Sequence, residues 1–317
     1  MPWRLSLKVQ RTELLALLLA SLAVSVAAGV ATAVLHGIQM SSACLQLFDG
    51  RQYTASEMRS CDGASTFLAV NAWAGWIMAA MAVLPLLGGA VVGSQLVSRE
   101  VDAGTAQWPW SLGLSRRRWL AQRLVPVALF VAAVTAVPAA MAWLLESARN
   151  PTVDAGSTFL DYGLRGPLVV GRALAALAVS LAIGAALGRS LPALLAASGA
   201  SALGLALLVA GTGWGASLTA VPSRDLTNRS GYILISSGWL TSGGIVLSED
   251  EARASSPNPA DAEQTLTWLL ANFQEVSLII PGEQAQEVAA REMGVLALTS
   301  VAGVLVAAAV VDRRRPY

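Results

Sequence analysis

Six long apolar runs restrict the fold of this chain more than any other feature of its sequence. Each approaches or exceeds the ~20 residues that a helix needs to cross the hydrocarbon core of a bilayer, where a helix satisfies its own backbone hydrogen bonds. Only 13% of the residues are charged, against about 25% in soluble domains. The sequence therefore predicts an all-α polytopic membrane protein with six transmembrane helices, over residues 13–38, 67–97, 120–145, 167–187, 191–212 and 292–311.

A single long polar segment, residues 214–291, separates the fifth and sixth apolar runs. Within it, residues 231–235 and 245–247 have the composition of short strands on either side of a glycine-rich turn. Residues 259–273 place apolar side chains on one face of a helix. We therefore expect a small folded α+β region here rather than a linker.

These segments divide the chain into three expected parts. Residues 1–213 hold the first five spans and a polar loop at 98–119, residues 214–291 form the polar region, and residues 292–317 hold the last span and a basic tail. In the fourth span, Gly184 and Gly188 form a small-xxx-small pattern, which suits close packing between helices.

Arginine clusters at 116–118 and 313–315 indicate how the chain crosses the membrane. Six spans place both termini on one side, which then holds twelve basic and four acidic residues, whereas the other side holds nine and sixteen. Cytoplasmic loops are enriched in Lys and Arg near the ends of spans. We therefore expect a plasma-membrane protein with cytoplasmic termini, a cytoplasmic segment 98–119 and an external region 214–291.

Both cysteines, Cys44 and Cys61, fall in the loop between the first two spans, which this orientation makes external. Disulfides persist in such oxidising surroundings, and a ring of this size would contribute about 3 kcal/mol in the chain-entropy model. The alternatives are a Cys44–Cys61 disulfide and two free thiols.

The residues needed for catalysis or metal binding are sparse. Two cysteines and the single histidine, His36, are too few for a four-ligand zinc site or for histidine-rich metal chemistry. The chain contains no Gly-x-x-x-x-Gly-Lys-Ser/Thr loop for nucleotide phosphates. We therefore expect no enzymatic activity and no cofactor or metal in this chain. Arg172, near the outer end of the fourth span, either extends to the membrane interface or contacts a transported substrate.

The polar segment 98–119 carries a pattern that resembles the ABC-2 type permeases, the membrane subunits of one class of ATP-binding cassette transporters. In that family the second span ends in Arg-Glu, an acidic-x-Gly-Thr segment follows, and Ser-Arg-x-x-Trp begins the third span. The external residues 236–239 (Ser-Ser-Gly-Trp) are similar to an element of actinobacterial members. The residues that match the cytoplasmic pattern are Arg99, Glu100, Asp102, Gly104, Thr105, Ser115, Arg116 and Trp119.

This resemblance implies a transmembrane subunit that pairs with a second transmembrane subunit and with two ATP-binding subunits, which bind ATP and Mg. Segment 98–119 would be the coupling helix that docks on the ATPase. Thr105 would cap that helix, Trp108 and Trp110 would be buried anchors, and Arg116, Arg117 and Arg118 would contact an acidic rim or lipid headgroups. The alternative for this segment is an ordinary basic loop with interfacial tryptophans.

The resemblance further implies export of an amphipathic small molecule, peptide or lipid-like substrate. Expected partners are the ATP-binding subunit, a second transmembrane subunit, forming a homodimer or a heterodimer, and membrane lipid, with no nucleic acid. The alternative from another class is a non-transporting membrane sensor, or a protein that transmits force, whose external region binds a ligand.

Overall fold

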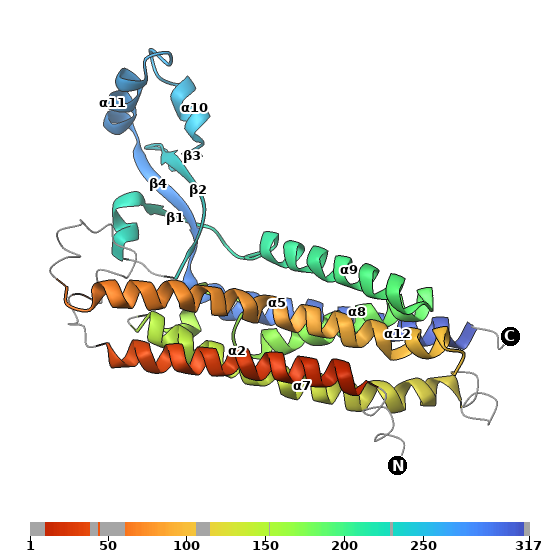
Figure 1. The fold of residues 1–317 in the computed structure, drawn as a ribbon. Coiled ribbons are helices and arrows are strands. Elements are labelled where there is room, and N and C mark those ends of the chain that lie inside the picture. Colours follow the sequence, from red (N-terminus) through yellow and green to blue (C-terminus); the bar gives the residue numbers. More distant parts are fainter. Residues whose placement is uncertain are drawn as a thin grey trace.

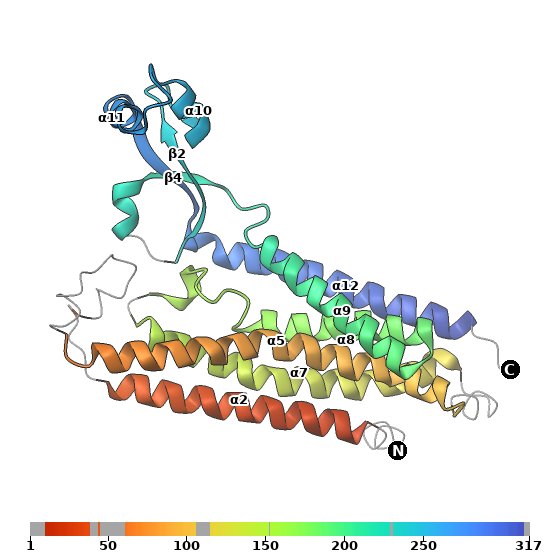
Figure 2. The same ribbon diagram turned by 45° about the horizontal axis from the view of Figure 1, so that its top comes forward.

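The computed structural model describes residues 10–38, 44, 61–105, 115–151, 153–228 and 231–313. In this part of the chain, long helices run side by side in a bundle, and a small sheet with two short helices projects from one end (Figures 1 and 2). The long helices are α2 (Arg11–Gly37), α5 (Ala64–Asp102), α7 (Arg116–Arg149), α8 (Pro167–Leu187), α9 (Ser190–Ala210) and α12 (Ala285–Arg313).

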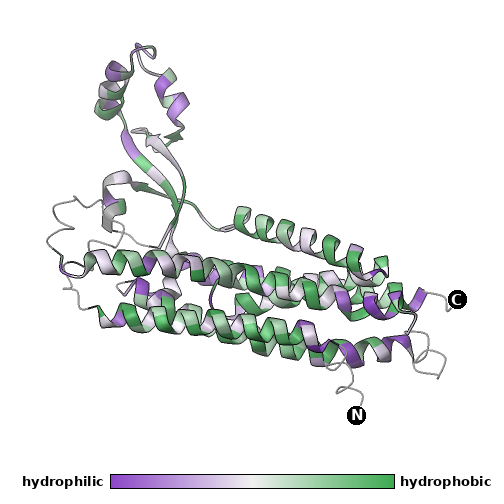
Figure 3. Cartoon of the chain, viewed as in Figure 1, coloured by the Kyte–Doolittle hydropathy of each residue, from purple (hydrophilic) through white to green (hydrophobic). Residues whose placement is uncertain are grey.

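Six helices of the described chain are long and apolar enough to cross a membrane, as the sequence predicts. Apolar residues cover most of their length, whereas polar residues gather at the bundle ends and in the projecting region (Figure 3). The fourth predicted span coincides with α8, but α5, α7 and α12 extend past the apolar runs. Helical hydrogen bonding continues into the polar flanks, so hydropathy marks the apolar core of each helix and not its ends.

The projecting region contains a four-stranded antiparallel sheet in the order β1-β4-β2-β3. Its strands and short helices are β1 (Thr219–Pro222), η2 (Ser223–Asn228), β2 (Ile233–Leu240), β3 (Val246–Leu247), α10 (Glu249–Ala254), α11 (Ala262–Asn272) and β4 (Gln274–Ile280). Two short 3-10 helices, η1 (Ala155–Ser157) and η3 (Gly282–Gln284), lie nearer the bundle.

The predicted amphipathic helix is present as α11, and two strands lie on either side of the glycine-containing turn. Strand β2 runs five residues past the predicted 231–235 and pairs with β3 through Trp239 and Leu240. The sequence pattern did not indicate β1, α10 or the central strand β4, which pairs with both β1 and β2. Strand β4 lacks the alternation of a half-buried strand, because Ile279 and Ile280 are both buried. A short continuous apolar run of this kind does not distinguish a strand from a helix.

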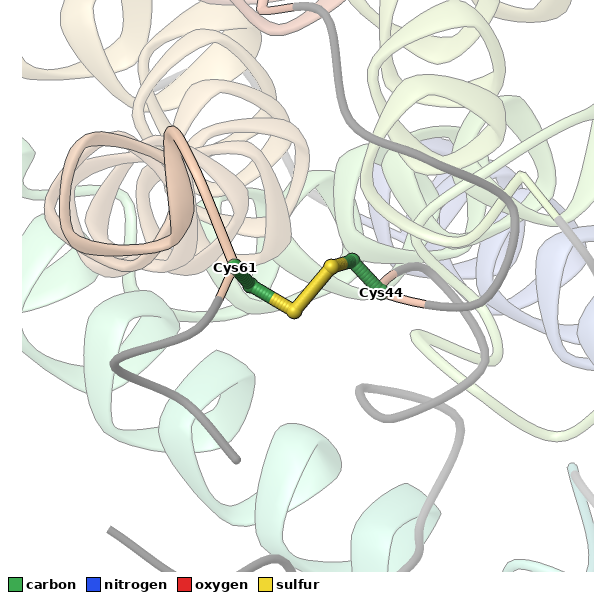
Figure 4. The surroundings of a disulfide bond; sticks show 2 residues. All are labelled: Cys44 and Cys61. Carbon is green, nitrogen blue, oxygen red and sulfur yellow. A yellow bond between two sulfur atoms is a disulfide. The ribbon is translucent and has the colours of Figure 1, made fainter. Parts of the chain in front are cut away.

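A disulfide joins Cys44 to Cys61, so the structure contains the first of the two alternatives left open by the sequence (Figure 4). The two Cα atoms are 5.8 Å apart, and Cys61 lies three residues before the first residue of α5. The bond therefore holds Cys44, which follows α2 in the chain, close to the start of α5.

Helix α8 occupies the centre of the bundle and α9 its edge. In the most apolar 18-residue stretch of each helix, 72% of the residues of α8 are buried, against only 17% of the residues of α9. Helix α8 packs against α5, α7, α9 and α12. Its buried face is built from alanine and leucine, including Leu177 and Leu181, which are 2% and 0% exposed. The fourth span is therefore the element around which the others are arranged.

Glycines allow α5 and α8 to approach each other closely. A Cβ atom on Gly93 would lie 2.3 Å from the carbonyl oxygen of Leu177, and one on Gly184 would lie 2.4 Å from that of Ser94. Both obstructing atoms belong to backbone, which cannot rotate away. Gly184 thus has the packing role that the small-xxx-small pattern suggests, whereas Gly188 adopts φ 64° and ends α8, a position that favours glycine.

This packing makes a testable prediction about Gly93. Gly93→Ala should lower the unfolding midpoint by the equivalent of about 1–3 kcal/mol, because overpacking forces backbone shifts. Thermal unfolding of the purified chain measures the effect. Gly75→Ala is the matched control, because Gly75 lies in the same helix with nothing within 4 Å of its would-be Cβ. Equal midpoints for the two variants would contradict the close approach.

Candidate coupling site

The ends of the predicted coupling segment lie at the end of the bundle where the described chain also begins and finishes (Figure 1). Helix α5 ends there at Asp102 and α7 begins there at Arg116. Residues 106–114, which include the proposed anchors Trp108 and Trp110, lie outside the described residues. The described part of the site consists of its two flanks, 99–105 and 115–119.

A buried ion pair joins the first flank to α7, one turn beyond the second flank. The Glu100 carboxylate accepts a hydrogen bond from the Arg123 guanidinium, and the side chains are 9% and 15% exposed. The Arg123 guanidinium also lies 4.7 Å from the centre of the Trp119 ring, within the range of a cation–π interaction. Trp119 itself is buried. The end of α5 and the first turns of α7 are thus held together by charge and by an aromatic ring.

Asp102, the last residue of α5, reaches the start of α9. One of its carboxylate oxygens accepts the backbone N–H of Ser190 at 3.1 Å and the Ser190 hydroxyl at 2.7 Å. Gln95, two turns earlier in α5, donates to the carbonyl oxygen of Ser190 at 3.2 Å. A carboxylate near free N–H groups at a helix start is favourable, so α5 and α9 are linked at this end.

The arginine cluster at the start of α7 reaches the last turn of α12. Arg116 donates to the carbonyl oxygens of Val311 and Asp312 at 3.2 and 2.7 Å. Arg117, largely exposed, pairs with the Asp312 carboxylate at 2.6 Å. An arginine is well placed there because the C-terminal carbonyls of a helix carry partial negative charge. This contact links α7 to α12.

Other described residues of the segment contact α2 and the end of α5. Arg99 pairs with Glu13 of α2 at 3.0 Å. Gly104 adopts φ 69°, and the Thr105 hydroxyl donates to the carbonyl oxygen of Glu100 at 3.3 Å. In the described residues Thr105 closes the end of α5. The helix that it is predicted to cap falls in residues 106–114, outside the described residues.

Ser115 is the N-cap of α7, where its hydroxyl accepts the backbone N–H of Arg118 at 3.4 Å. The Arg118 side chain is exposed. Together with Arg117 it presents positive charge at the surface beside the segment, so these two side chains are available to a partner.

Five residues whose side chains belong to this network were not among the predicted site residues: Glu13, Gln95, Arg123, Ser190 and Asp312. Arg123 could have been suspected from the sequence. It lies near the start of the third predicted span, and Glu100 follows the second span at the same end, so the two residues could form a pair of opposite charges. Ser190 and Asp312 gave no such signal, since their partners depend on how distant spans pack.

Arg172 lies at the opposite end of the bundle and has a structural partner. Its guanidinium is within 2.7 Å of the Glu292 carboxylate and donates to the carbonyl oxygen of Gly163 at 3.1 Å. The side chain is buried. It therefore joins α8 to α12 and to the loop that precedes α8. In the described residues no group of three or more His, Cys, Asp or Glu could hold a metal ion.

The Glu100–Arg123 pair should contribute measurably to stability. Glu100→Ala leaves a buried guanidinium without its carboxylate, which costs about 3–5 kcal/mol, so the unfolding midpoint should fall. Adding Arg123→Met to Glu100→Ala should restore most of the loss, because it removes the unpaired charge. Arg118→Ala, at an exposed position, is the control. If the double variant is as unstable as the sum of its single variants, the two residues do not form a pair.

One of three comparisons with known proteins found a match. The family model described as "ABC-2 membrane transporter related" matches residues 16–212, which include α5, α7, α8, α9 and the whole candidate coupling segment. No curated protein and no solved structure matches the chain. The matched residues make up more than half of the 317 and support a multi-pass membrane protein that associates with an ATP-binding subunit. The chain belongs to the ABC-2 membrane transporter related family.

Proposed function

We propose that this chain is the transmembrane permease subunit of an ATP-binding cassette exporter. It pairs with a second transmembrane subunit and with two ATP-binding subunits, which bind ATP and Mg and supply the energy. The transported substrate is an amphipathic small molecule, peptide or lipid-like compound. Membership of the ABC-2 family supports a transporter over a non-transporting sensor.

The charge distribution supports a cytoplasmic position for the candidate coupling site. Four acidic residues lie at this end in the described chain: Glu13, Glu100, Asp102 and Asp312. Eight arginines accompany them: Arg11, Arg99, Arg116, Arg117, Arg118, Arg123, Arg189 and Arg313. An excess of arginine beside short loops is typical of the cytoplasmic side. The projecting sheet region, at the other end of the bundle, is then external.

The observation that carries the proposal is the set of contacts between the segment's flanks and distant helices. Glu100 holds α7 through Arg123, Asp102 holds the start of α9, and Arg116 holds the end of α12. A displacement of the residues between the flanks therefore acts on four helices together. An ordinary basic loop would not need this set of directional contacts.

Exposed arginines should control recruitment of the ATPase. We expect the double variant Arg117→Glu/Arg118→Glu to reduce co-purification of a co-expressed ATP-binding subunit from the same genome by about tenfold or more, because reversed charges repel an acidic rim. The unfolding midpoint should change little, since exposed ion pairs contribute about 0–1 kcal/mol.

Arg253→Glu is the matched control, because Arg253 is an exposed arginine in the projecting region. Recruitment that is unchanged by the double variant would refute docking through this surface.

A second variant distinguishes the transmission of movement between helices from the docking of the ATP-binding subunit. Asp102→Ala removes both hydrogen bonds to Ser190 but leaves Arg117 and Arg118 in place. We expect the ATP-binding subunit to co-purify normally, while stimulation of its ATPase by the permease falls several-fold. Ser190→Ala, which removes the shorter of the two bonds, should give a smaller loss. Normal stimulation in the Asp102→Ala variant would show that α5 and α9 are not coupled through this contact.

A further inference from the structure

A cavity of about 420 Å³ lies at the end of the bundle opposite the coupling site. It is bounded by the end of α7, the loop that leads into α8, and the first turns of α8 and α12. Its size is within the range of about 300–1,000 Å³ that is common for ligand sites. Most of its wall is apolar and includes Trp143, Leu168, Ala289, Ala290 and Met293.

One charged side chain lines this apolar cavity. Arg165 is only 8% exposed, and its guanidinium donates through Nη2 to the carbonyl oxygen of Thr158 at 2.8 Å. Its Nη1 is buried and makes no hydrogen bond within the described part of the chain. The guanidinium also lies 5.8 Å from the centre of the Trp143 ring. Burial lowers the pKa of Arg165, which reflects the cost of removing its charge from water.

The start of α8 adds a second group that favours a negatively charged ligand. Gly166 is the N-cap of this 21-residue helix and offers no side chain, and no side-chain cap hydrogen bond is present. Pro167 and Leu168 follow, and all three residues line the cavity. An uncapped helix start carries free N–H groups and partial positive charge, which attract anions and acceptors. The Arg165 guanidinium and the start of α8, where Pro167 itself has no N–H, therefore both line the cavity.

Nearby acids do not neutralise these donors through direct contact. Asp161 pairs with Arg149, and Glu146 lies 3.6 Å from the same guanidinium. Asp154 accepts hydrogen bonds from the backbone N–H of Gly156 and the hydroxyl of Ser157. The negative charges of these carboxylates oppose the binding of an anion in the cavity. None of them is hydrogen-bonded to Arg165 in the described residues.

From this combination we propose that the cavity binds an amphipathic molecule whose carboxylate or phosphate group contacts Arg165 and the start of α8. Its apolar part would lie along the wall formed by Trp143, Leu168 and Met293. A buried donor without an acceptor is unfavourable, and a charged acceptor forms the stronger class of hydrogen bond. The site concerns ligand binding by this chain alone and does not depend on the proposed exporter function.

The test measures binding of dansyl-undecanoate to the full chain in nanodiscs of phosphatidylcholine, with empty nanodiscs subtracted. We expect saturable binding, and about tenfold weaker binding of the neutral analogue dansyl-undecanol. Arg165→Gln should weaken the carboxylate probe about tenfold and leave the alcohol nearly unchanged. Arg253→Gln, which removes an exposed arginine far from the cavity, is the control.

A second variant tests the apolar part of the site without altering Arg165. Ala290 lines the cavity and is exposed, so Ala290→Phe should fill space and weaken both probes without unfolding the chain. Ala297→Phe is the matched control, because Ala297 is exposed on the same helix face two turns later and does not line the cavity. Unfolding midpoints confirm that each variant is folded.

The same assay distinguishes the two sources of such a ligand. Nanodiscs that contain phosphatidylglycerol should shift the probe titration if the occupant is a lipid headgroup, and should leave it unshifted if the occupant is a free amphiphile. No saturable binding, or equal affinity in the wild type, Arg165→Gln and Ala290→Phe, would overturn the proposal. Loss of binding in Ala290→Phe alone would overturn the headgroup contact.

Discussion

The close approach of α5 and α8 is the constraint on which the rest of the bundle depends. Where Gly93 meets Leu177 and Gly184 meets Ser94, a single added carbon would lie within 2.5 Å of a backbone oxygen. In an apolar environment, van der Waals packing and small residues replace the hydrophobic effect as the basis of helix association. Because α8 is central, this contact positions α5 relative to α7, α9 and α12.

The polar contacts lie at the two ends of this packed centre and have different forms. At the coupling end, Glu100, Asp102 and Arg116 each bridge a different pair of helices. At the other end, Arg172 and Glu292 join α8 to α12, while Arg165 keeps a donor without a partner in the described chain. The first set is suited to transmitting movement. The second set stabilises the bundle and leaves one group available to a ligand.

Much of the architecture could be predicted from local patterns. The six apolar helices, the β2–β3 hairpin and α11 follow from hydropathy, turn residues and helical periodicity, which act over a few neighbouring residues. The central strand β4 could not be predicted in the same way, because its consecutive residues Ile279 and Ile280 are both buried, although successive side chains of a strand point to opposite faces. The six apolar helices were thus easier to predict from the sequence than the projecting sheet.

The sequence alone determined the class of protein, because runs of about 20 apolar residues have few stable structures other than membrane helices, and the motif around Glu100 pointed to the family. The tertiary structure decided which charges meet. Glu100 and Arg123 are 23 residues apart in the chain, Asp102 and Ser190 are 88 apart, and Arg172 and Glu292 are 120 apart. Such pairs depend on the order and rotation of packed helices, which hydropathy does not encode.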